Sequence, residues 1–409
     1  MGKDVLIIAH FCSDFDGKGN NRFNYLANLL AKSHFDVELV TSDFSHIKKI
    51  KRDKNTGNFN YKITYISEPI YKHNVSLKRF YSHFFIGRNL KKYLKNRKKP
   101  DVIYCAVPSL DMARVAAEYA TKNKIKFIID VQDLWPEAFK MIFNIPIISN
   151  LLFYPMQKQA NYIYAAADEI ISVSETYKDR ALKVNNKCKK AYSIFLGTEL
   201  DTFDKMSIVN KVSDKPKNEI WVAYAGTLGH SYDLTSVIDA LEILKNKGIV
   251  NVKFIIMGDG PLKSKFEEYV KTKSINAVFT GRMDYGKMVG ILKACDIAVN
   301  PISSGAAQSI INKHADYAAA GLPVINTQEN SEYRNLVNEY QMGLNCENNN
   351  PKDLAEKLMI VYRDQKLRAT MSQNSRRLAV SKFDRKNTYQ IIVDLISDST
   401  KSTSLKKLG

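Results

Sequence analysis

The stretch Gly305–Thr327, GAAQSIINKHADYAAAGLPVINT, decides the fold of this chain. The apolar run before it, residues 296–300, predicts a buried strand. A loop of small and polar residues follows, and then an alanine-rich helix that Gly321 ends and Pro323 cannot continue. Residues 324–325 begin another strand. This order of strand, loop, helix and strand predicts part of a parallel sheet, which holds ligands at the carboxyl ends of its strands.

Two charged residues distinguish the predicted helix. Lys313 falls in its first turn and Asp316 follows one turn later. Free N–H groups and the positive dipole end attract anions at a helix start. A cation and an acid there suit a ligand with phosphate at one end and hydroxyls at the other. The alternative is a solvated lysine with an aspartate that only stabilises the dipole, and position alone leaves both open.

Length and composition indicate a globular protein of more than one domain. The chain has 409 residues, 45% of them hydrophobic and 25% charged, which predicts two domains. No apolar run reaches the roughly 18 residues of a spanning helix, and we expect no signal peptide. The five cysteines are scattered without a CxxC pair. This pattern favours a reducing cytosol over a disulfide framework or zinc site.

The net charge of +19 predicts an anionic partner. Nucleic acid, a phosphate-rich small molecule and an anionic membrane surface are the candidate classes. No helix-turn-helix, zinc or stacking signature accompanies the charge, so we expect no nucleic acid. A biased base composition that inflates the lysine content is the alternative explanation.

Strand and helix patterns alternate along most of the chain, on both sides of a polar, lysine-rich segment at 204–219 that predicts a linker. Such alternation is typical of parallel sheets covered by helices. It predicts the α/β class, with two doubly wound, Rossmann-like domains facing a central cleft. We expect one domain over 1–203 and a second over 204–384, with a C-terminal helix at about 385–399 packing back on the first.

Glycine turns follow several predicted strands. Gly17 to Asn20 follows the first strand, and Gly226 to Gly229 follows the first strand of the second half. Glycines allow backbone N–H groups to approach phosphate oxygens closely, and His230 adds a donor. Arg282 ends a later strand and Gly258 to Pro261 forms a turn that we interpret as structural. Each signal is weak alone, but their recurrence favours a phosphate-bearing ligand.

The sequence resembles the retaining glycosyltransferases of family 4, which have the two-domain GT-B fold and use nucleotide-sugar donors. The resemblance spans essentially the whole chain and is carried by YAGTLG at 224–229, MGDGP at 257–261, FTGR at 279–282, INKHADYAAAGLPVI at 311–325 and FLGTELDTF at 195–203. The segment IDVQDLWPE at 129–137 is similar to a subset that builds bacterial surface polysaccharides.

The resemblance implies roles for individual residues. It implies an acceptor-side first domain and a donor-binding second domain, with the diphosphate at the 226–229 turn and Lys313, the ribose at Asp316, and the base near Arg282. The implied donor-binding residues are Gly17, Gly19, Gly226, Thr227, Gly229, His230, Arg282, Lys313 and Asp316, and the implied catalytic residues are Asp133, Gln308 and Lys313.

The sequence also departs from the family pattern. Gln308 and Asp316 stand where the family places two glutamates. Gln308 can hydrogen-bond a sugar hydroxyl but cannot supply charge to an oxocarbenium-like transition state. Thr227 and His230 replace the arginine and lysine of many members, and Gln132 replaces a histidine. A weakened or inactive site is therefore an alternative, although we favour an active enzyme.

The expected reaction moves a hexose or acetamido sugar from a UDP-sugar to a lipid-linked saccharide in capsule, exopolysaccharide or O-antigen synthesis. With no covalent nucleophile evident, we expect a same-face substitution in which the departing phosphate oxygen deprotonates the acceptor. We expect no metal or other cofactor, because fixed cations would replace it. The alternatives are a UDP-sugar 2-epimerase and a non-catalytic, nucleotide-sugar-binding partner subunit, which Gln308 favours.

A basic–aromatic helix at 77–99 and an apolar segment at 141–164 belong to the first half. Such segments can lie on an anionic membrane surface. They predict a cytoplasmic protein bound peripherally to the inner face of the plasma membrane. The alternative is a core-facing helix with a solvated basic side.

Overall fold

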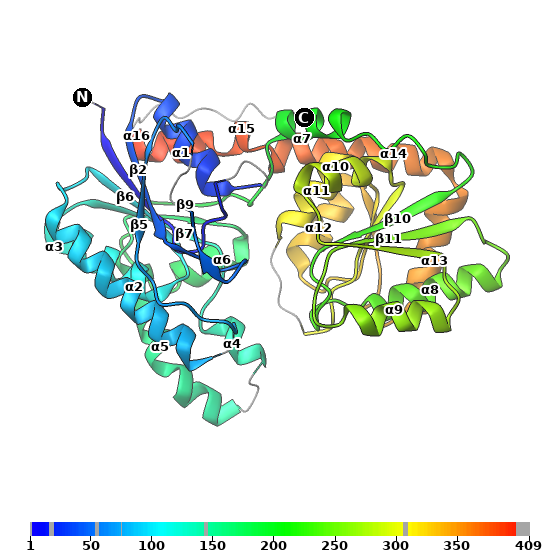
Figure 1. Cartoon of the computed structure of the whole chain (residues 1–409), viewed down its shortest axis with the longest axis horizontal. Helices are drawn as coiled ribbons and strands as arrows, with labels where there is room; N and C mark the ends of the chain where they lie inside the picture. Colours follow the sequence, from blue (N-terminus) through cyan, green and yellow to red (C-terminus); the bar gives the residue numbers. More distant parts are fainter. Residues whose placement is uncertain are drawn as a thin grey trace. The chain divides into compact units, whose positions relative to one another are not determined.

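The computed structural model describes residues 2–15, 20–53, 57–74, 76–142, 146–305 and 310–397. It divides into two compact units (Figure 1). The first contains the N-terminal strand, residues 21–194 and the chain from Thr388 onward. The second contains residues 195–387 together with Asn20. The gaps include Gly17, Gly19 and Gln308, so three of the predicted site residues lie outside the described residues.

The first unit is built on a seven-stranded sheet in the order β5-β2-β1-β6-β7-β8-β9, in which every pair is parallel. Its strands are β1 (Asp4–Ile8), β2 (Asp36–Ser42), β5 (Lys62–Ile66), β6 (Val102–Val107), β7 (Lys126–Val131), β8 (Glu169–Ser172) and β9 (Lys190–Ser193). A short antiparallel ribbon joins β3 (Phe44–Ser45) to β4 (Ile50–Lys51). The central strands are continuous apolar runs because helices cover both faces of the sheet.

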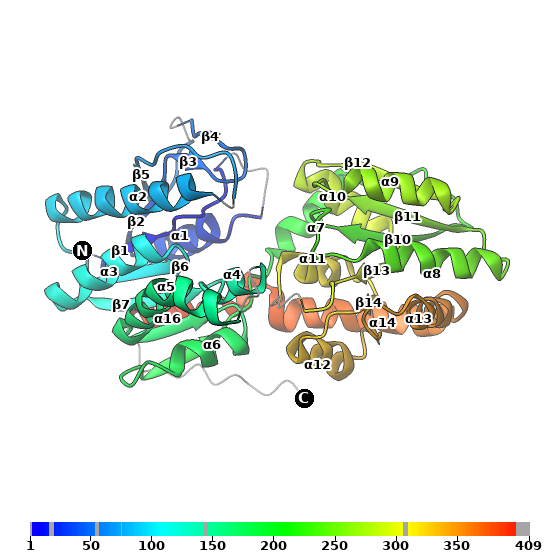
Figure 2. The same ribbon diagram turned by 90° about the horizontal axis from the view of Figure 1, so that it is seen from below.

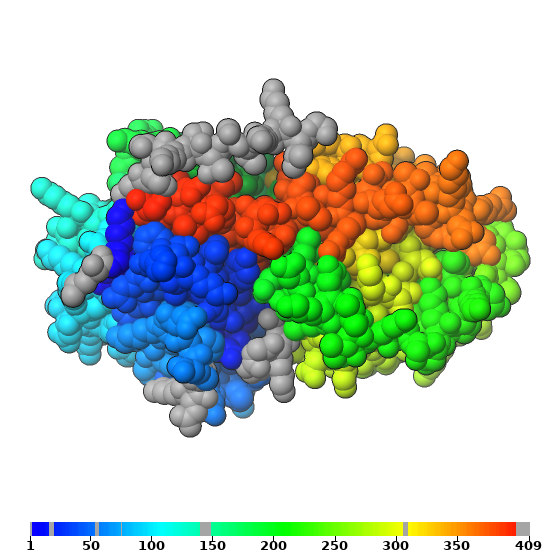
Figure 3. Space-filling model, turned by 90° about the horizontal axis from the view of Figure 1, so that it is seen from above, coloured from blue at the N-terminus to red at the C-terminus, as the bar shows by residue number. Residues whose placement is uncertain are grey.

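The helices of the first unit are α1 (Arg22–Lys32), α2 (Leu77–Asn96), α3 (Leu110–Asn123), α4 (Glu137–Ile142), α5 (Pro146–Ala166), α6 (Glu175–Leu182) and α16 (Gln390–Ser397). Figure 1 shows α2, α3 and α5 on one side of this sheet and α1 on the other, and Figure 2 shows the side with α2, α3 and α5 from below. In Figure 3 the red surface of α16 lies along the blue surface of the N-terminal segment. Lys3 Nζ donates to Ile396 O at 3.3 Å, and Lys126 Nζ donates to Leu395 O at 2.6 Å. The end of the chain thus completes the first unit.

The second unit has a six-stranded parallel sheet in the order β12-β11-β10-β13-β14-β15. Its strands are β10 (Ile220–Ala225), β11 (Val252–Met257), β12 (Ala277–Gly281), β13 (Ile297–Asn300), β14 (Val324–Asn326) and β15 (Gly343–Asn345). Its helices are α7 (Leu200–Val209), α8 (Leu234–Asn246), α9 (Lys263–Thr272), α10 (Tyr285–Ala294), α11 (Asn312–Ala320), α12 (Ser331–Tyr340), α13 (Pro351–Arg363) and α14 (Gln365–Leu378), followed by a π-helical turn at Ala379–Phe383 and by α15 (Arg385–Thr388). The predicted α/β class with two doubly wound parallel sheets is confirmed.

The predicted linker is partly wrong. The first residues of the 204–219 segment continue α7, whose apolar face packs in the core of the second unit. Leu200 and Phe203 are buried there with Trp221 and Leu292. The polar composition of the segment does not reveal this helix, because the buried residues Leu200 and Phe203 precede the segment. As a result, the second unit begins at Phe195, ahead of the boundary expected at residue 203.

The strand order reverses between β10 and β13 in the second unit. Loops on the two sides of such a reversal diverge and leave a crevice at the carboxyl ends of the strands, where open α/β sheets bind ligands. The glycine turn after β10 and the loop between β13 and α11 leave the sheet at this point. The fold therefore brings the two strongest sequence signals to one edge of one sheet.

Candidate functional site

The two glycine turns of the second unit pack directly against each other. A Cβ atom on Gly258 would lie 1.8 Å from Gly226 O, and one on Gly260 would lie 2.3 Å from Leu228 O. Gly226 N donates to Met257 O at 3.0 Å and Leu228 N to Asp259 O at 3.0 Å. The 258–261 turn thus has the structural role that we expected, because it packs against the 226–229 turn and hydrogen-bonds to it.

Because of this pairing, the N–H group of Gly226 is not available to a ligand. That group is already bonded, so Gly226 serves the turn through its backbone conformation, with φ at +151°. Within the described residues, the N–H groups of Thr227 and Gly229 have no backbone acceptor. Thr227 and His230 are exposed beside them. Alternate N–H groups of the turn are therefore the ones open to a ligand.

Lys313 lies at the start of α11 and is buried, with 6% of its surface exposed. Its Nζ atom has no hydrogen-bond partner in the described structure. The amine sits 4.2 Å from the ring centre of Tyr232 and 5.1 Å from that of Tyr224, residues that flank the 226–229 turn. Burial holds the pKa of Lys313 well below its usual value. An anion bound here would favour the charged form of Lys313 and accept a hydrogen bond from its Nζ atom.

Asp316 is buried one turn further along α11. Its carboxylate accepts a hydrogen bond from Tyr285 Oη at 2.6 Å, and Tyr285 Oη lies 3.1 Å from Thr198 Oγ1. Burial raises the pKa of Asp316 to about 6, against the opposing effects of the Tyr285 hydrogen bond and the Arg385 charge. Asn20 Nδ2 in turn donates to Thr198 Oγ1 at 3.2 Å. Asp316 is therefore held by a chain of polar residues that runs through Tyr285 and Thr198 to Asn20.

Several contacts fix the position of α11. Tyr317 Oη accepts from Ala225 N at 2.8 Å, which ties the helix to the end of β10. His314 Nδ1 accepts from Ile311 N at 2.9 Å, and its Nε2 lies 3.1 Å from Asn300 Nδ2. Asn300 and Asn326 continue this network across the strand ends with a bond of 2.8 Å. Since Lys313 stands between the anchored residues, its backbone position is set by the sheet.

The two other described residues of the predicted site, Arg282 and Asp133, lie on other elements. Arg282 is exposed at the end of β12, three residues before Tyr285. Asp133 belongs to the first unit, where it follows β7 and accepts from Leu134 N at 2.9 Å and Trp135 Nε1 at 3.1 Å. Burial raises the pKa of Asp133. Sequence reasoning missed Tyr224, Tyr232 and Tyr285, although Tyr224 opens the YAGTLG motif and was the available signal.

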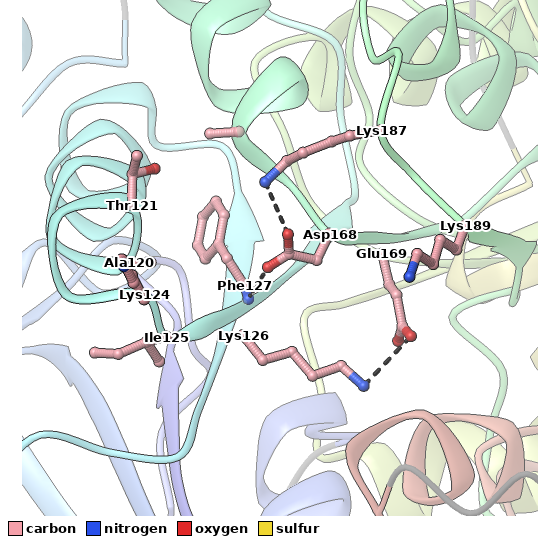
Figure 4. Close-up of a pocket in the computed structure, with 11 residues that line it drawn as sticks. Ala120, Thr121, Lys124, Ile125, Lys126, Phe127, Asp168, Glu169, Lys187 and Lys189 are labelled. Atoms are coloured by element: carbon pink, nitrogen blue, oxygen red, sulfur yellow. Dashed lines mark hydrogen bonds and ion pairs between the residues drawn. The ribbon is translucent and has the colours of Figure 1, made fainter.

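A cavity of about 590 Å³ lies elsewhere, in the first unit. It opens at the amino-terminal ends of β7 and β8, and Figure 4 shows Lys187 paired with Asp168 and Lys126 paired with Glu169. Its lining charges are therefore largely satisfied. Ligand sites of parallel sheets lie at the opposite, carboxyl ends, so this cavity is not the candidate site.

Two groups bear on metal binding. His10, Glu68 and His83 in the first unit each place a ligand atom within 4.8 Å of the others. The Glu68 carboxylate is already bonded by His10, Ser42 and Ser82 at 2.8, 2.5 and 2.6 Å. The sequence also contains an Asp-x-Asp triplet at 14–16, which the expectation of a metal-free enzyme did not take into account. Asp14 of that triplet pairs with Arg52 and Lys48, each at 2.8 Å.

Comparisons with known proteins show which families and folds the chain resembles. Residues 207–378 match the family model of the glycosyl transferases group 1. Over 367 residues the chain is 22% identical to the capsular polysaccharide biosynthesis glycosyltransferase CapM of Staphylococcus aureus, with 87% of each chain covered. The matched family segment contains the 226–229 turn, Lys313 and Asp316.

Two solved structures show the same fold at 14% sequence identity. HepE of Anabaena, solved in complex with UDP, has a TM-score of 0.71 over 97% of this chain and 100% of its own. Sucrose-phosphate synthase of Thermosynechococcus elongatus has a TM-score of 0.74 over 97% of this chain and 98% of its own. The chain has the GT-B fold. The match of residues 207–378 to the family model and the similarity to CapM support a glycosyltransferase.

Proposed function

We propose that the protein is a retaining glycosyltransferase of family 4, in the subset that builds bacterial surface polysaccharides. It transfers a hexose or acetamido sugar from a UDP-sugar to a lipid-linked saccharide. The observation that carries the proposal is the buried, unpartnered amine of Lys313 at the start of α11, next to the 226–229 turn. The UDP bound to HepE and the capsule pathway of CapM support this choice of donor and product.

In this proposal Lys313 and the N–H groups of Thr227 and Gly229 hold the diphosphate, and Asp316 accepts hydrogen bonds from the ribose. His230 is proposed to donate to the diphosphate and Arg282 to lie near the base, and both side chains are exposed. The C–O bond to UDP breaks, and a new C–O bond to the acceptor forms on the same face of the sugar. The departing phosphate oxygen takes the proton of the acceptor hydroxyl. Lys313 and the helix dipole stabilise the charge that develops on UDP, so the reaction needs no metal or other cofactor.

A lipid-linked acceptor requires a protein that works at a membrane surface. No helix in the described part of the chain is long and apolar enough to cross a membrane. Instead, α2 and α5 expose large apolar side chains: Leu77, Phe80, Tyr81 and Phe84 on α2, and Leu151, Leu152 and Tyr154 on α5. Both helices pack against α3, and lysines interleave the apolar residues of α2. The proposed location is the cytoplasmic face of the plasma membrane, with these helices in the interface.

The test is an assay of nucleotide release. The protein is incubated with a panel of UDP- and GDP-sugars, with and without a lipid-diphosphate-linked saccharide, and free UDP and GDP are measured. Release of UDP that depends on the acceptor, and is lost in Lys313→Ala, supports transfer. Isomerisation at C2 of the sugar without transfer would replace the proposal by an epimerase. Binding of the donor without turnover would replace it by a non-catalytic partner subunit.

A further inference from the structure

Two cationic side chains and a histidine converge on one tyrosine in the first unit. His46 and Lys49 lie in the turn of the β3–β4 ribbon, and Arg79 lies in the first turns of α2. His46 Nδ1 lies 2.5 Å from Tyr71 Oη, and Lys49 Nζ lies 4.6 Å from the Tyr71 ring centre. Arg79 interacts electrostatically with the same tyrosine. We call His46, Lys49 and Arg79 the basic triad.

The basic triad has no acidic partner. In the parts of the chain that the structure describes, no carboxylate oxygen lies within 4.0 Å of its nitrogens. Lys49 Nζ and Arg79 Nη1 donate only to the neutral oxygens of Asn74, at 2.5 and 2.8 Å. Arg79 Nε is buried and unpartnered. The site therefore presents positive charge and a free donor.

Neighbouring basic residues behave differently. Lys48, Lys51 and Arg52 of the same ribbon pair with Asp14 or Asp43 at 2.6–2.8 Å. Glu68, the nearest buried acid, is bonded by His10, Ser42 and Ser82. Among the described basic residues of the ribbon, His46 and Lys49 thus differ from their neighbours in having no acidic partner.

The triad residues also disfavour each other's charge. Burial and the Arg79 charge lower the pKa of Lys49. Burial, with the charges of Lys49 and Arg79, lowers the pKa of His46 to about 4. The Glu68 charge acts in the opposite direction and raises the pKa of each residue of the triad. An anion bound between Lys49 and Arg79 would further reduce the repulsion between these two charges.

Exposed apolar side chains flank each member of the triad. Ile47 follows His46, Ile50 follows Lys49, and Leu77 and Phe80 lie on either side of Arg79 along α2, with 44–87% of their surfaces exposed. Ile70, next to Tyr71, is 50% exposed. A soluble phosphate compound would use the cations but not these side chains. A charged centre among apolar side chains matches an isoprenoid or similar lipid that ends in phosphate.

We propose that His46, Lys49 and Arg79 bind the phosphate or diphosphate of the acceptor lipid, and that Ile47, Ile50, Leu77 and Phe80 contact its hydrocarbon chain. This inference rests on the proposed function, because it takes the acceptor to be lipid-linked. It names the part of the acceptor that the protein recognises and assigns that recognition to the first unit.

Binding of farnesyl diphosphate, a soluble isoprenoid diphosphate, tests the proposal. The fluorescence of Trp135 provides the signal, because the Arg79 guanidinium lies 4.9 Å from its ring centre. Arg79→Gln and Lys49→Gln should each weaken binding at least tenfold. The matched control is Lys78→Gln, which removes the same charge from an exposed position on the same helix and should change binding less than twofold. Equal weakening in the control would overturn the proposal, because it would show non-specific attraction.

Two further ligands separate the sources of affinity. Farnesol should bind at least tenfold more weakly than farnesyl diphosphate, and so should inorganic pyrophosphate. If farnesol bound as tightly as farnesyl diphosphate, the proposed phosphate site would be wrong. If pyrophosphate bound as tightly as farnesyl diphosphate, the proposed contacts with the hydrocarbon chain would be wrong. UDP affinity, measured in the same variants, should stay unchanged. Farnesyl diphosphate binding that depends on Arg79 in a protein that transfers no sugar would leave this site standing while the proposed function failed.

Discussion

The amine of Lys313 lacks a hydrogen-bond acceptor in the described structure, and a bound ligand would supply one. This amine is buried against two tyrosine rings. A hydrogen bond from a charged group contributes about 1.5–3 kcal/mol, so Lys313→Ala should weaken UDP binding by roughly 10- to 150-fold. Calorimetric titration with UDP measures this loss. The exposed Lys265 supplies the control variant, Lys265→Ala, which should bind UDP normally.

The fold should survive this substitution. A buried lysine without a partner is costly, and Lys313→Met keeps the chain length while removing the amine. The thermal midpoint of Lys313→Met should therefore equal or exceed that of the wild type. If Lys313→Met bound UDP with the wild-type affinity, Lys313 would not be part of the donor site.

Asp316 should make stability depend on pH. Its pKa rises from 3.8 to about 6 on folding, so the unfolded chain loses this proton first. The folded state is thus fully favoured below pH 3.8 and loses stability as the pH rises through about 6. Each unit corresponds to about 1.4 kcal/mol, which gives a loss of about 3 kcal/mol. Asp316→Asn keeps an oxygen that can accept from Tyr285 but does not ionise.

Urea unfolding at two pH values measures this effect. The free energy of unfolding of Asp316→Asn should match the wild type near pH 4 and exceed it near pH 7.5 by up to about 3 kcal/mol. The same variant should bind UDP more weakly if Asp316 holds the ribose. A difference between the two proteins that stays constant with pH would contradict the assignment of the raised pKa to Asp316.

At the residue scale, sequence reasoning found the charged residues and missed their neighbours. Lys313 and Asp316 stand out because helix starts have known chemistry. Tyr285 is 31 positions from Asp316, and their contact depends on how α10 packs beside α11. Thr198 and Asn20 join the site through still longer separations. No local pattern encodes such contacts, because they arise from tertiary packing.

At the element scale, the paired glycine turns are the feature most exposed to mutation. A methyl group on Gly258 would lie 1.8 Å from the backbone oxygen of Gly226, so Gly258→Ala must push the two turns apart. We expect a loss of stability of about 3 kcal/mol or more, in the range of severe steric lesions. UDP binding should fall as well, because the 226–229 turn is displaced. Thermal unfolding and UDP titration measure the two effects.

Gly248→Ala is the matched control for this prediction. Gly248 also has a positive φ, of +83°, but no atom lies within 4 Å of its would-be Cβ. Backbone strain of about 1 kcal/mol is the only expected penalty. Similar losses of UDP binding in both variants would show that the packing of the turns does not shape the site.

Helices and strands could be predicted from the sequence where their pattern of apolar residues was long and regular. The buried strands of both sheets are continuous apolar runs, and their alternation with helices sufficed for the α/β class. The α7 helix was missed because its buried apolar residues, Leu200 and Phe203, stand at its start, ahead of the polar, lysine-rich segment. The β3–β4 ribbon, with two residues in each strand, is too short to produce a periodic pattern.

At the scale of the whole molecule, the net charge of +19 and the exposed apolar residues of α2 and α5 make a joint prediction. Basic residues near an anionic surface contribute about 1 kcal/mol each, and apolar side chains add affinity that salt does not screen. The protein should therefore sediment with anionic vesicles at low ionic strength. Most of this binding should disappear near 1 M salt, where the Debye length falls to about 3 Å.

Paired variants show which surface is responsible. Leu77→Ser combined with Phe80→Ser should reduce sedimentation severalfold, because it removes apolar contacts from α2. Val250→Ser alters an equally exposed residue, with 72% of its surface exposed, in the second unit and should have no effect. Equal losses in both variants would assign the binding to general surface hydrophobicity. A protein that stays in solution with anionic vesicles at low salt would remove the membrane from the proposed function, and the acceptor would then be sought among soluble saccharides.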